Sequence, residues 1–161
     1  QYRIYYLSDP LTGLGQNPMN APSVFNYFRP SYVPPNSPLA AASLVAPEMQ
    51  ITAEPSVTGY LNFIQDAISG GVGENASVKA DYAAELALAD QPAALLDRVD
   101  LLLLAGNMST KLRGTILSTV NSVPIPAATG SNAAQVNLAR TYRVRLAIFL
   151  SMASPEYLVQ K

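Results

Sequence analysis

The sequence contains neither cysteine nor histidine among its 161 residues. Without cysteine the chain forms no disulfide and has no thiolate nucleophile. Without histidine it has no Ser–His pair and no zinc site of the usual kind. These absences exclude several classes of catalytic and metal site, and we expect no cofactor. They say little about the compartment, because a chain without cysteine fits an exported protein and a cytosolic one equally well.

Charge is also scarce. Charged residues make up 13% of the chain and hydrophobic residues 49%, and the net charge is −1. This balance gives no general attraction for nucleic acid or for an anionic membrane. The longest apolar run, Leu101–Ala105, is far too short to cross a bilayer. We therefore expect no nucleic-acid partner and no transmembrane segment, and we expect apolar surface to be left for another chain or domain.

What is present in quantity is proline, in a long segment that also carries many aromatic residues. The stretch from Leu14 to Ile51 follows neither a helical nor a strand period, and its prolines disfavour long helices and central strands. It is too apolar for a disordered linker. We predict an ordered, irregular segment over residues 10–51 that its aromatic side chains hold in place.

Helical patterns follow this segment. We expect helices over residues 52–69, 77–88, 90–105, 109–123 and 132–153, then a short turn over 154–160. Thr52, Ser77, Asp90, Ser109 and Ser154 are the predicted N-caps. The predicted stripe of the last long helix contains Leu138, Tyr142, Leu146, Phe149 and Ala153. The fold class is all-α: about five helices in one incomplete domain, 1–161, with residues 52–161 as the helical part and the irregular segment wrapped around it.

The first residues suggest that the chain is part of something longer. Residues 1–9 (QYRIYYLSD) resemble the end of a helix with no start signal before it, and Pro10 stops it. We expect a C-terminal portion of a longer protein, whose remainder would be its first partner.

The candidate contact residues lie in the irregular segment. They are an amide pair, Asn17 and Asn20, and the aromatic residues Phe25, Tyr27 and Tyr32. The amides suit a structural role, because Asn side chains bond to backbone groups that form no ladder. The alternative is a groove for a sugar or a peptide, with the aromatic rings as stacking platforms.

Charged residues offer three further interpretations. Arg29 and Glu48 flank the segment and could pair across it, or both could be solvated. Glu48, Glu54 and Asp66 could supply acid–base chemistry, although their spacing does not favour it. Arg140, Arg143 and Arg145 form no single patch, so we expect them to bind Asp97, Asp100 or helix carbonyl ends rather than an anion.

Four separated motifs resemble one family. They are LGQNPMNAPSVFNYFRPSYVPP, LVAPEMQI, LLLLAGNMS and RVRLAIFLSMASPEYLVQK, and together they resemble the C-terminal part of the bacterial family of unknown function DUF1800. The resemblance implies a longer, mostly helical, commonly exported protein, often encoded beside a sulfatase-like partner. It implies a periplasmic, outer-envelope or extracellular location. No activity and no catalytic residue can be carried over from it.

Three hypotheses for function remain. The first is a non-catalytic structural or protein-interaction module of an envelope or secreted protein. The second is part of an enzyme or carbohydrate-binding protein whose reactive residues lie in a preceding portion of the chain. The third is a subunit of an extended assembly. No catalytic constellation appears in the sequence, so the enzyme question leans toward no for this chain.

Overall fold

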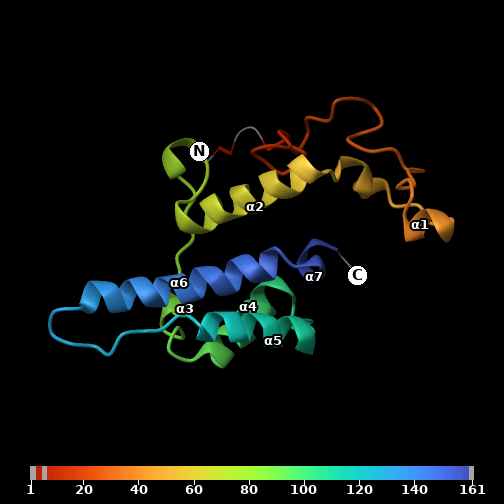
Figure 1. The fold of residues 1–161 in the computed structure, drawn as a ribbon. Coiled ribbons are helices and arrows are strands. Elements are labelled where there is room, and N and C mark those ends of the chain that lie inside the picture. Colours follow the sequence, from red (N-terminus) through yellow and green to blue (C-terminus); the bar gives the residue numbers. More distant parts are fainter. Residues whose placement is uncertain (1–2, 5–6, 160–161) are drawn as a thin grey trace. The chain divides into compact units, whose positions relative to one another are not determined.

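The computed structural model describes residues 3–4 and 7–159, and this part of the chain is helical, with no strand assigned in it (Figure 1). The all-α prediction is confirmed. The chain divides into two compact units, residues 1–78 and residues 79–161. The prediction of a single domain stays a prediction. Arg3 and Ile4 have no helical assignment. The rest of the expected helix end at residues 1–9 depends on 1–2 and 5–6, which lie outside the described residues.

The first unit contains the irregular segment and one long helix. Within residues 10–51 the structure has only two short helices, α1 (Pro38–Ala41) and the 3-10 helix η1 (Pro47–Ile51). Helix α2 (Glu54–Ser69) follows and buries Ile64 and Ile68. The 3-10 helix η2 (Glu74–Ala76) lies in a loop that Val72 and Val78 close by pairing their backbones.

The N-cap of α2 differs from the predicted one. It is Ala53 rather than Thr52, and the hydroxyl of Ser56 accepts a hydrogen bond from the Ala53 N–H at 2.8 Å. This is half of a capping box, in which a side chain in the first turn satisfies the backbone donor of the cap residue. The start of α2 is therefore stabilised from within the helix.

A glycine in the middle of α2 marks where the irregular segment lies against this helix. A Cβ atom on Gly59 would lie 2.3 Å from the carbonyl oxygen of Pro10 and 2.9 Å from that of Leu11. Glycine weakens a helix interior by about 1 kcal/mol relative to alanine. Here the missing side chain lets the backbone of the segment approach the helix closely.

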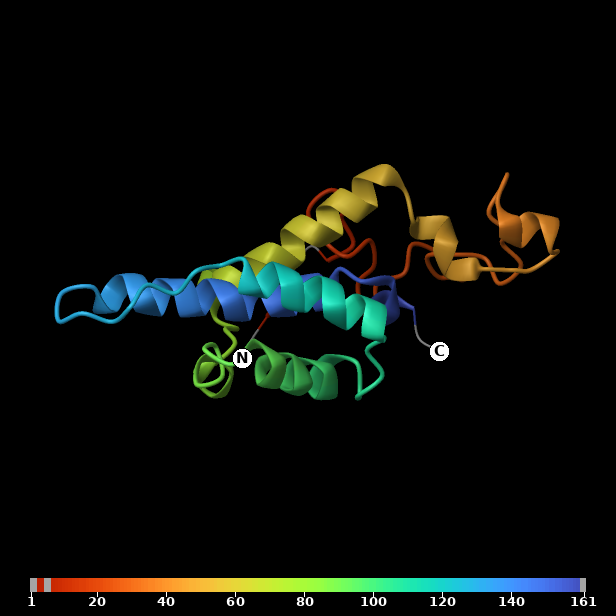
Figure 2. The same ribbon diagram turned by 60° about the horizontal axis from the view of Figure 1, so that its bottom comes forward.

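The second unit is built from three helices: α4 (Pro92–Leu103), α5 (Thr110–Asn121) and α6 (Ala133–Met152). Helices α4 and α5 run antiparallel, and α6 runs back beside α5 (Figure 2). Two single-turn helices, α3 (Ala83–Leu86) and α7 (Pro155–Leu158), precede and follow them. The core of this unit contains Leu95, Leu96, Val99, Ile116, Val120, Val144 and Ala147.

The predicted stripe of the last long helix is wrong at its start. Leu138 and Tyr142 are 54% and 55% exposed. The buried stripe is shifted around the helix, to Val144, Ala147, Ile148 and Ser151. This stripe has the i, i+3, i+4, i+7 spacing of a core face, and its small residues let the neighbouring helices come close.

Two of the predicted helix starts are also wrong. The helix expected from Ser77 is reduced to α3, because Val78 bonds to Val72 and the Asp81 carboxylate accepts from the N–H of Ala83 at 2.9 Å. The N-cap of α4 is Gln91 rather than Asp90. Ser109 and Ser154 are N-caps as predicted, since their hydroxyls accept from the N–H groups of Leu112 and Tyr157.

Candidate functional site

A tyrosine hydroxyl braces the turn that carries most of the candidate residues. The hydroxyl of Tyr27 donates to the carbonyl oxygen of Asn20 at 2.7 Å and accepts from the N–H of Asn17 at 3.0 Å. The two asparagines are therefore held by their backbone groups, whereas we predicted a role for their amide side chains. The brace joins both ends of a loop whose prolines supply no N–H donors. Tyr27 is thus a structural residue of this turn.

Replacing Tyr27 with phenylalanine should loosen the turn without removing the ring. Two hydrogen bonds of a half-buried hydroxyl are lost, at a net cost of about 1 kcal/mol. Amide hydrogen exchange of Asn17 and Asn20 should accelerate while exchange in α5 stays constant. Unchanged exchange at residues 17–20 would show that the hydroxyl does not hold the turn.

Residues near the C-terminal end of the irregular segment bond back to the stretch around Arg29. The N–H of Arg29 donates to the side-chain carbonyl of Gln50 at 2.8 Å, and the N–H of Ala46 donates to the carbonyl oxygen of Tyr32 at 2.8 Å. No ion pair joins Arg29 to Glu48 in the described part of the chain. Of the two alternatives for this pair, solvation is the one observed, since Arg29 and Glu48 are both exposed. The bond to the Arg29 backbone comes from the amide of Gln50 instead. Sequence reasoning missed Gln50, because 21 residues separate it from its partner.

These contacts leave a shallow groove of about 430 Å³ on the first unit. The predicted residues Phe25 and Glu48 lie in it together with Val24, Asn26, Phe28, Pro30 and Pro47. Phe25 is 65% exposed and Val24 is 95% exposed. Asn17, Asn20, Arg29, Tyr27 and Tyr32 are not among the lining residues. The structure therefore divides the predicted set into an apolar groove and the braces that shape it.

The three carboxylates that were considered for acid–base work do not converge. Glu48 lines this groove, whereas Asp66 lines a separate depression with Leu11, Thr12, Asn62, Phe63 and Gln65. Glu54 lies in the first turn of α2. Within residues 3–4 and 7–159 no group of three or more acidic side chains could hold a metal ion.

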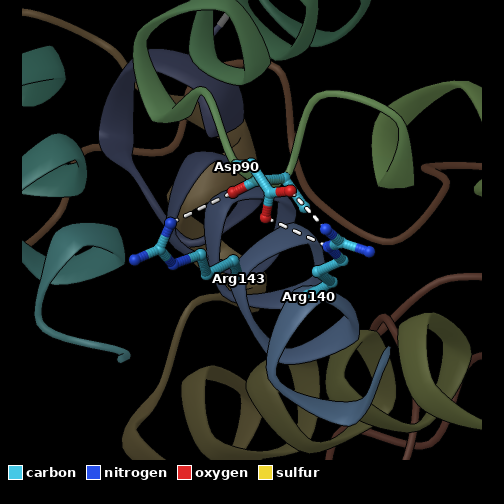
Figure 3. Close-up of polar contacts among 4 residues, drawn as sticks. Asp90, Arg140 and Arg143 are labelled. Carbon is cyan, nitrogen blue, oxygen red and sulfur yellow. Dashed lines mark hydrogen bonds and ion pairs between the residues drawn. The ribbon is translucent and has the colours of Figure 1, made fainter. Parts of the chain in front are cut away.

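The arginines of α6 bind to the second unit itself (Figure 3). Arg140 pairs with the Asp90 carboxylate through two of its nitrogens. Arg143 donates to the carbonyl oxygens of Val123 at 2.9 Å and Ala89 at 3.2 Å. The prediction of carbonyl ends as partners is confirmed for Arg143. The predicted partner Asp97 instead pairs with Arg113, so the arginines tie α6 to the residues that precede α4 and follow α5.

The Asp90 pair should make the stability of the second unit sensitive to acid. The hydrogen bond from Arg140 lowers the pKa of Asp90 below its ordinary value. A carboxyl group whose pKa is lowered by folding adds stability above its unfolded pKa and loses it as the pH falls through the folded pKa. Urea denaturation of the wild type and of Asp90→Asn should therefore differ at pH 7 and converge below about pH 4. If the stabilities of the two proteins fell in parallel as the pH decreased below about 4, the assignment would be contradicted.

The C-terminal turn is tied to the start of α5. The Glu156 carboxylate accepts from the N–H of Ser109 at 2.8 Å and from its hydroxyl at 2.5 Å. A carboxylate at this place interacts favourably with the N-terminal end of the helix dipole. Two of the motifs that carry the family resemblance, LLLLAGNMS and SPEYL, thus meet in space although 47 residues separate them.

The second unit also contains a buried charge. The side chain of Glu85 in α3 is 9% exposed and accepts a hydrogen bond from the Nε of Arg98 in α4 at 2.5 Å. Burial raises the pKa of the neighbouring Tyr82, and the charge of Arg145 acts in the opposite direction. Nothing in the local sequence signals this pair, because Glu85 and Arg98 belong to different helices.

Comparison with known proteins identifies the family. The model of the protein family of unknown function DUF1800 matches residues 2–159. The chain belongs to the DUF1800 family. The resemblance seen in the motifs is thereby confirmed over nearly the whole chain. No curated protein and no solved structure matches this DUF1800 chain. Among the described residues, no helix has both the length and the apolarity of a membrane span.

Proposed function

We propose that this DUF1800 chain is a non-catalytic structural or protein-interaction module of a bacterial envelope or secreted protein. Its contact surface is the groove that contains Phe25 and Glu48, together with the turn that Tyr27 braces. The observation that carries the proposal is the exposure of apolar side chains on a segment that is internally fixed. Phe25 and Val24 remain outside the core, while Tyr27 and Gln50 hold the backbone beneath them.

Fixed aromatic side chains suit a contact surface for an energetic reason. A partner gains the apolar area of the ring without having to order a flexible loop, which lowers the entropic cost of association. The low charge of the chain acts in the same direction, since few charged groups must be desolvated when the surface is covered. The partner would be the remainder of a longer chain, an envelope protein or a second copy.

Site-specific photocrosslinking in the native host tests the proposal. Benzoylphenylalanine at position 25 should form an adduct with a second molecule of the envelope, while the same residue at the exposed position 118 in α5 should not. Equal labelling at both positions would contradict the proposed contact surface. A protein adduct of defined mass would name the partner directly.

The groove also supports a second candidate, carbohydrate binding. Two aromatic rings, Phe25 and Phe28, lie beside one carboxylate, Glu48. Sugars bind to such surfaces through ring stacking and hydrogen bonds to an acidic group. Titration with envelope oligosaccharides, followed by NMR, should shift the signals of the groove if this is its role, and Glu48→Gln should weaken the effect. Unchanged spectra would remove this candidate.

A further inference from the structure

A short connector joins the two compact units of the chain. The boundary between the units falls between Val78 and Lys79 in the sequence. Lys79, Ala80 and Asp81 are exposed and belong to no helix. Within the described part of the chain their N–H groups donate no hydrogen bond, although Val72 and Val78 pair their backbones just before them. Exposed backbone without such bonds is where proteases most often cut a folded protein.

Lys79 also differs from the other basic residues in its surroundings. Between residues 7 and 159, helices α4, α5 and α6 contain Arg98, Lys111, Arg113, Arg140, Arg143 and Arg145. A peptide bond inside a helix has to unfold locally before an enzyme can bind it. Arg29 lies outside the helices, but Pro30 follows it, and a bond to the ring nitrogen of proline resists enzymes of trypsin specificity. Lys79 is the remaining basic residue of this range.

The helical unit that follows the connector has a core of its own. The fully buried side chains of α4, α5 and α6 include Leu95, Ile116, Val120 and Val144. Polar contacts tie the unit together as well, since Asp90 pairs with Arg140 and Glu156 accepts from Ser109. All of these contacts lie on the C-terminal side of Lys79. A domain of about 80 residues with such a core is large enough to fold alone.

From these observations we infer that a protease that recognises a basic side chain, of the trypsin or lysyl endopeptidase class, divides this chain at the Lys79–Ala80 peptide bond. Hydrolysis consumes one water: its oxygen joins the carbonyl carbon of Lys79, and its two protons go to the nitrogen of Ala80 as the C–N bond breaks. Residues 80–161 keep their fold after the cut, and Phe25 and Glu48 belong to the other fragment. The inference goes beyond the proposed function, because it concerns the connector and requires no partner at the groove.

Digestion of the native full chain with lysyl endopeptidase tests the site, because the chain contains a matched control. Lys79 and Lys111 are both exposed, but Lys111 lies in α5. The bond after Lys79 should be cut at least about 100-fold faster, since cleavage in α5 requires local unfolding. Intact-mass measurement should show a fragment that begins at Ala80. Equal rates, or faster cutting after Lys111, would overturn the inference.

Two controls separate the structure from the preference of the enzyme. In concentrated urea the two rates should approach each other, because the unfolded chain exposes both bonds. A difference that persisted in urea would come from the residues beside each lysine and would overturn the inference. Trypsin also accepts arginine, and between residues 7 and 159 its first cut should still follow Lys79. Lys79→Gln should keep this range intact at least about tenfold longer, and cutting at the wild-type rate would place the preferred site elsewhere.

Hydrogen exchange of the digest tests whether the helical unit survives the cut. The amides of α4, α5 and α6 should keep the protection that they have in the intact chain, because the core and the polar contacts between them are untouched. Loss of protection in these three helices after cleavage at Lys79 would show that residues 80–161 depend on the covalent link, which overturns the inference.

Discussion

Replacing Gly59 with alanine is expected to destabilise the first unit by about 2 kcal/mol, although alanine is the better helix former. The new Cβ atom would lie 2.3 Å from the Pro10 carbonyl oxygen, well inside van der Waals contact. Either α2 or the turn at Pro10 and Leu11 has to move. The cost of this displacement exceeds the gain of about 1 kcal/mol in helix propensity.

The turn has little freedom to change its own conformation, because hydrogen bonds within residues 7–14 hold it. The Asp9 carboxylate accepts from the N–H of Leu11 and from the hydroxyl of Thr12, both at 2.8 Å. These bonds lower the pKa of Asp9. The N–H of Leu14 also donates to the carbonyl oxygen of Leu7 at 2.7 Å. The clash is therefore expected to separate the braced turn from α2 rather than to distort it.

Hydrogen exchange and urea denaturation measure the effect. In Gly59→Ala, exchange should accelerate in α2 and at Gly13 and Leu14 while α4 and α6 keep their protection. Gly114→Ala in α5 is the matched control, because its Cβ would meet nothing within 4 Å, and it should stabilise the protein by about 0.5–1 kcal/mol. If both variants were stabilised equally, the turn would not lie on α2.

Helix features that depend only on neighbouring residues could be predicted from the sequence, whereas those that depend on distant residues could not. The serine caps Ser109 and Ser154 were predictable, because a cap depends on residues within one turn of the helix. Asp90 has the chemistry of a cap but binds Arg140, 50 residues away, and this tertiary contact decides its role. The predicted stripe of α6 followed the largest apolar side chains. The buried stripe instead uses Ala147 and Ser151, whose value lies in close helix packing.

The candidate site was partly predictable for the same reason. Its location in the aromatic segment follows from composition, and Phe25 and Glu48 do lie together in the groove. The partners of the braces did not follow from the sequence. Aromatic side chains were expected to hold the segment in place, with stacking against a ligand as the alternative for Tyr27, but the hydroxyl of Tyr27 bonds to backbone groups 7 and 10 residues away. Gly59 carried a usable signal, since a glycine inside a helical pattern often marks close packing.

Removing Arg98 is expected to destabilise the second unit by about 2–3 kcal/mol, because it leaves the Glu85 carboxylate buried without its cation. Glu85 as a whole residue is 7% exposed, so water cannot replace the guanidinium. The variant Arg98→Met removes the guanidinium and keeps an unbranched apolar side chain in place of the arginine stem. Urea denaturation at pH 7 gives its free energy of unfolding. The loss should fall on unfolding of α3 and α4, which hydrogen exchange reports locally.

A double-mutant cycle shows whether the buried charge is the cause. Arg98→Met combined with Glu85→Gln should regain at least about 1 kcal/mol relative to Arg98→Met alone, because the amide carries no charge to desolvate. The exposed pair Arg113–Asp97 is the control: the Asp97 side chain is 70% exposed, and Asp97→Asn should cost less than about 1 kcal/mol. If the double variant were no more stable than Arg98→Met, the destabilisation would come from lost packing of the arginine stem, and Glu85 would tolerate burial without a partner.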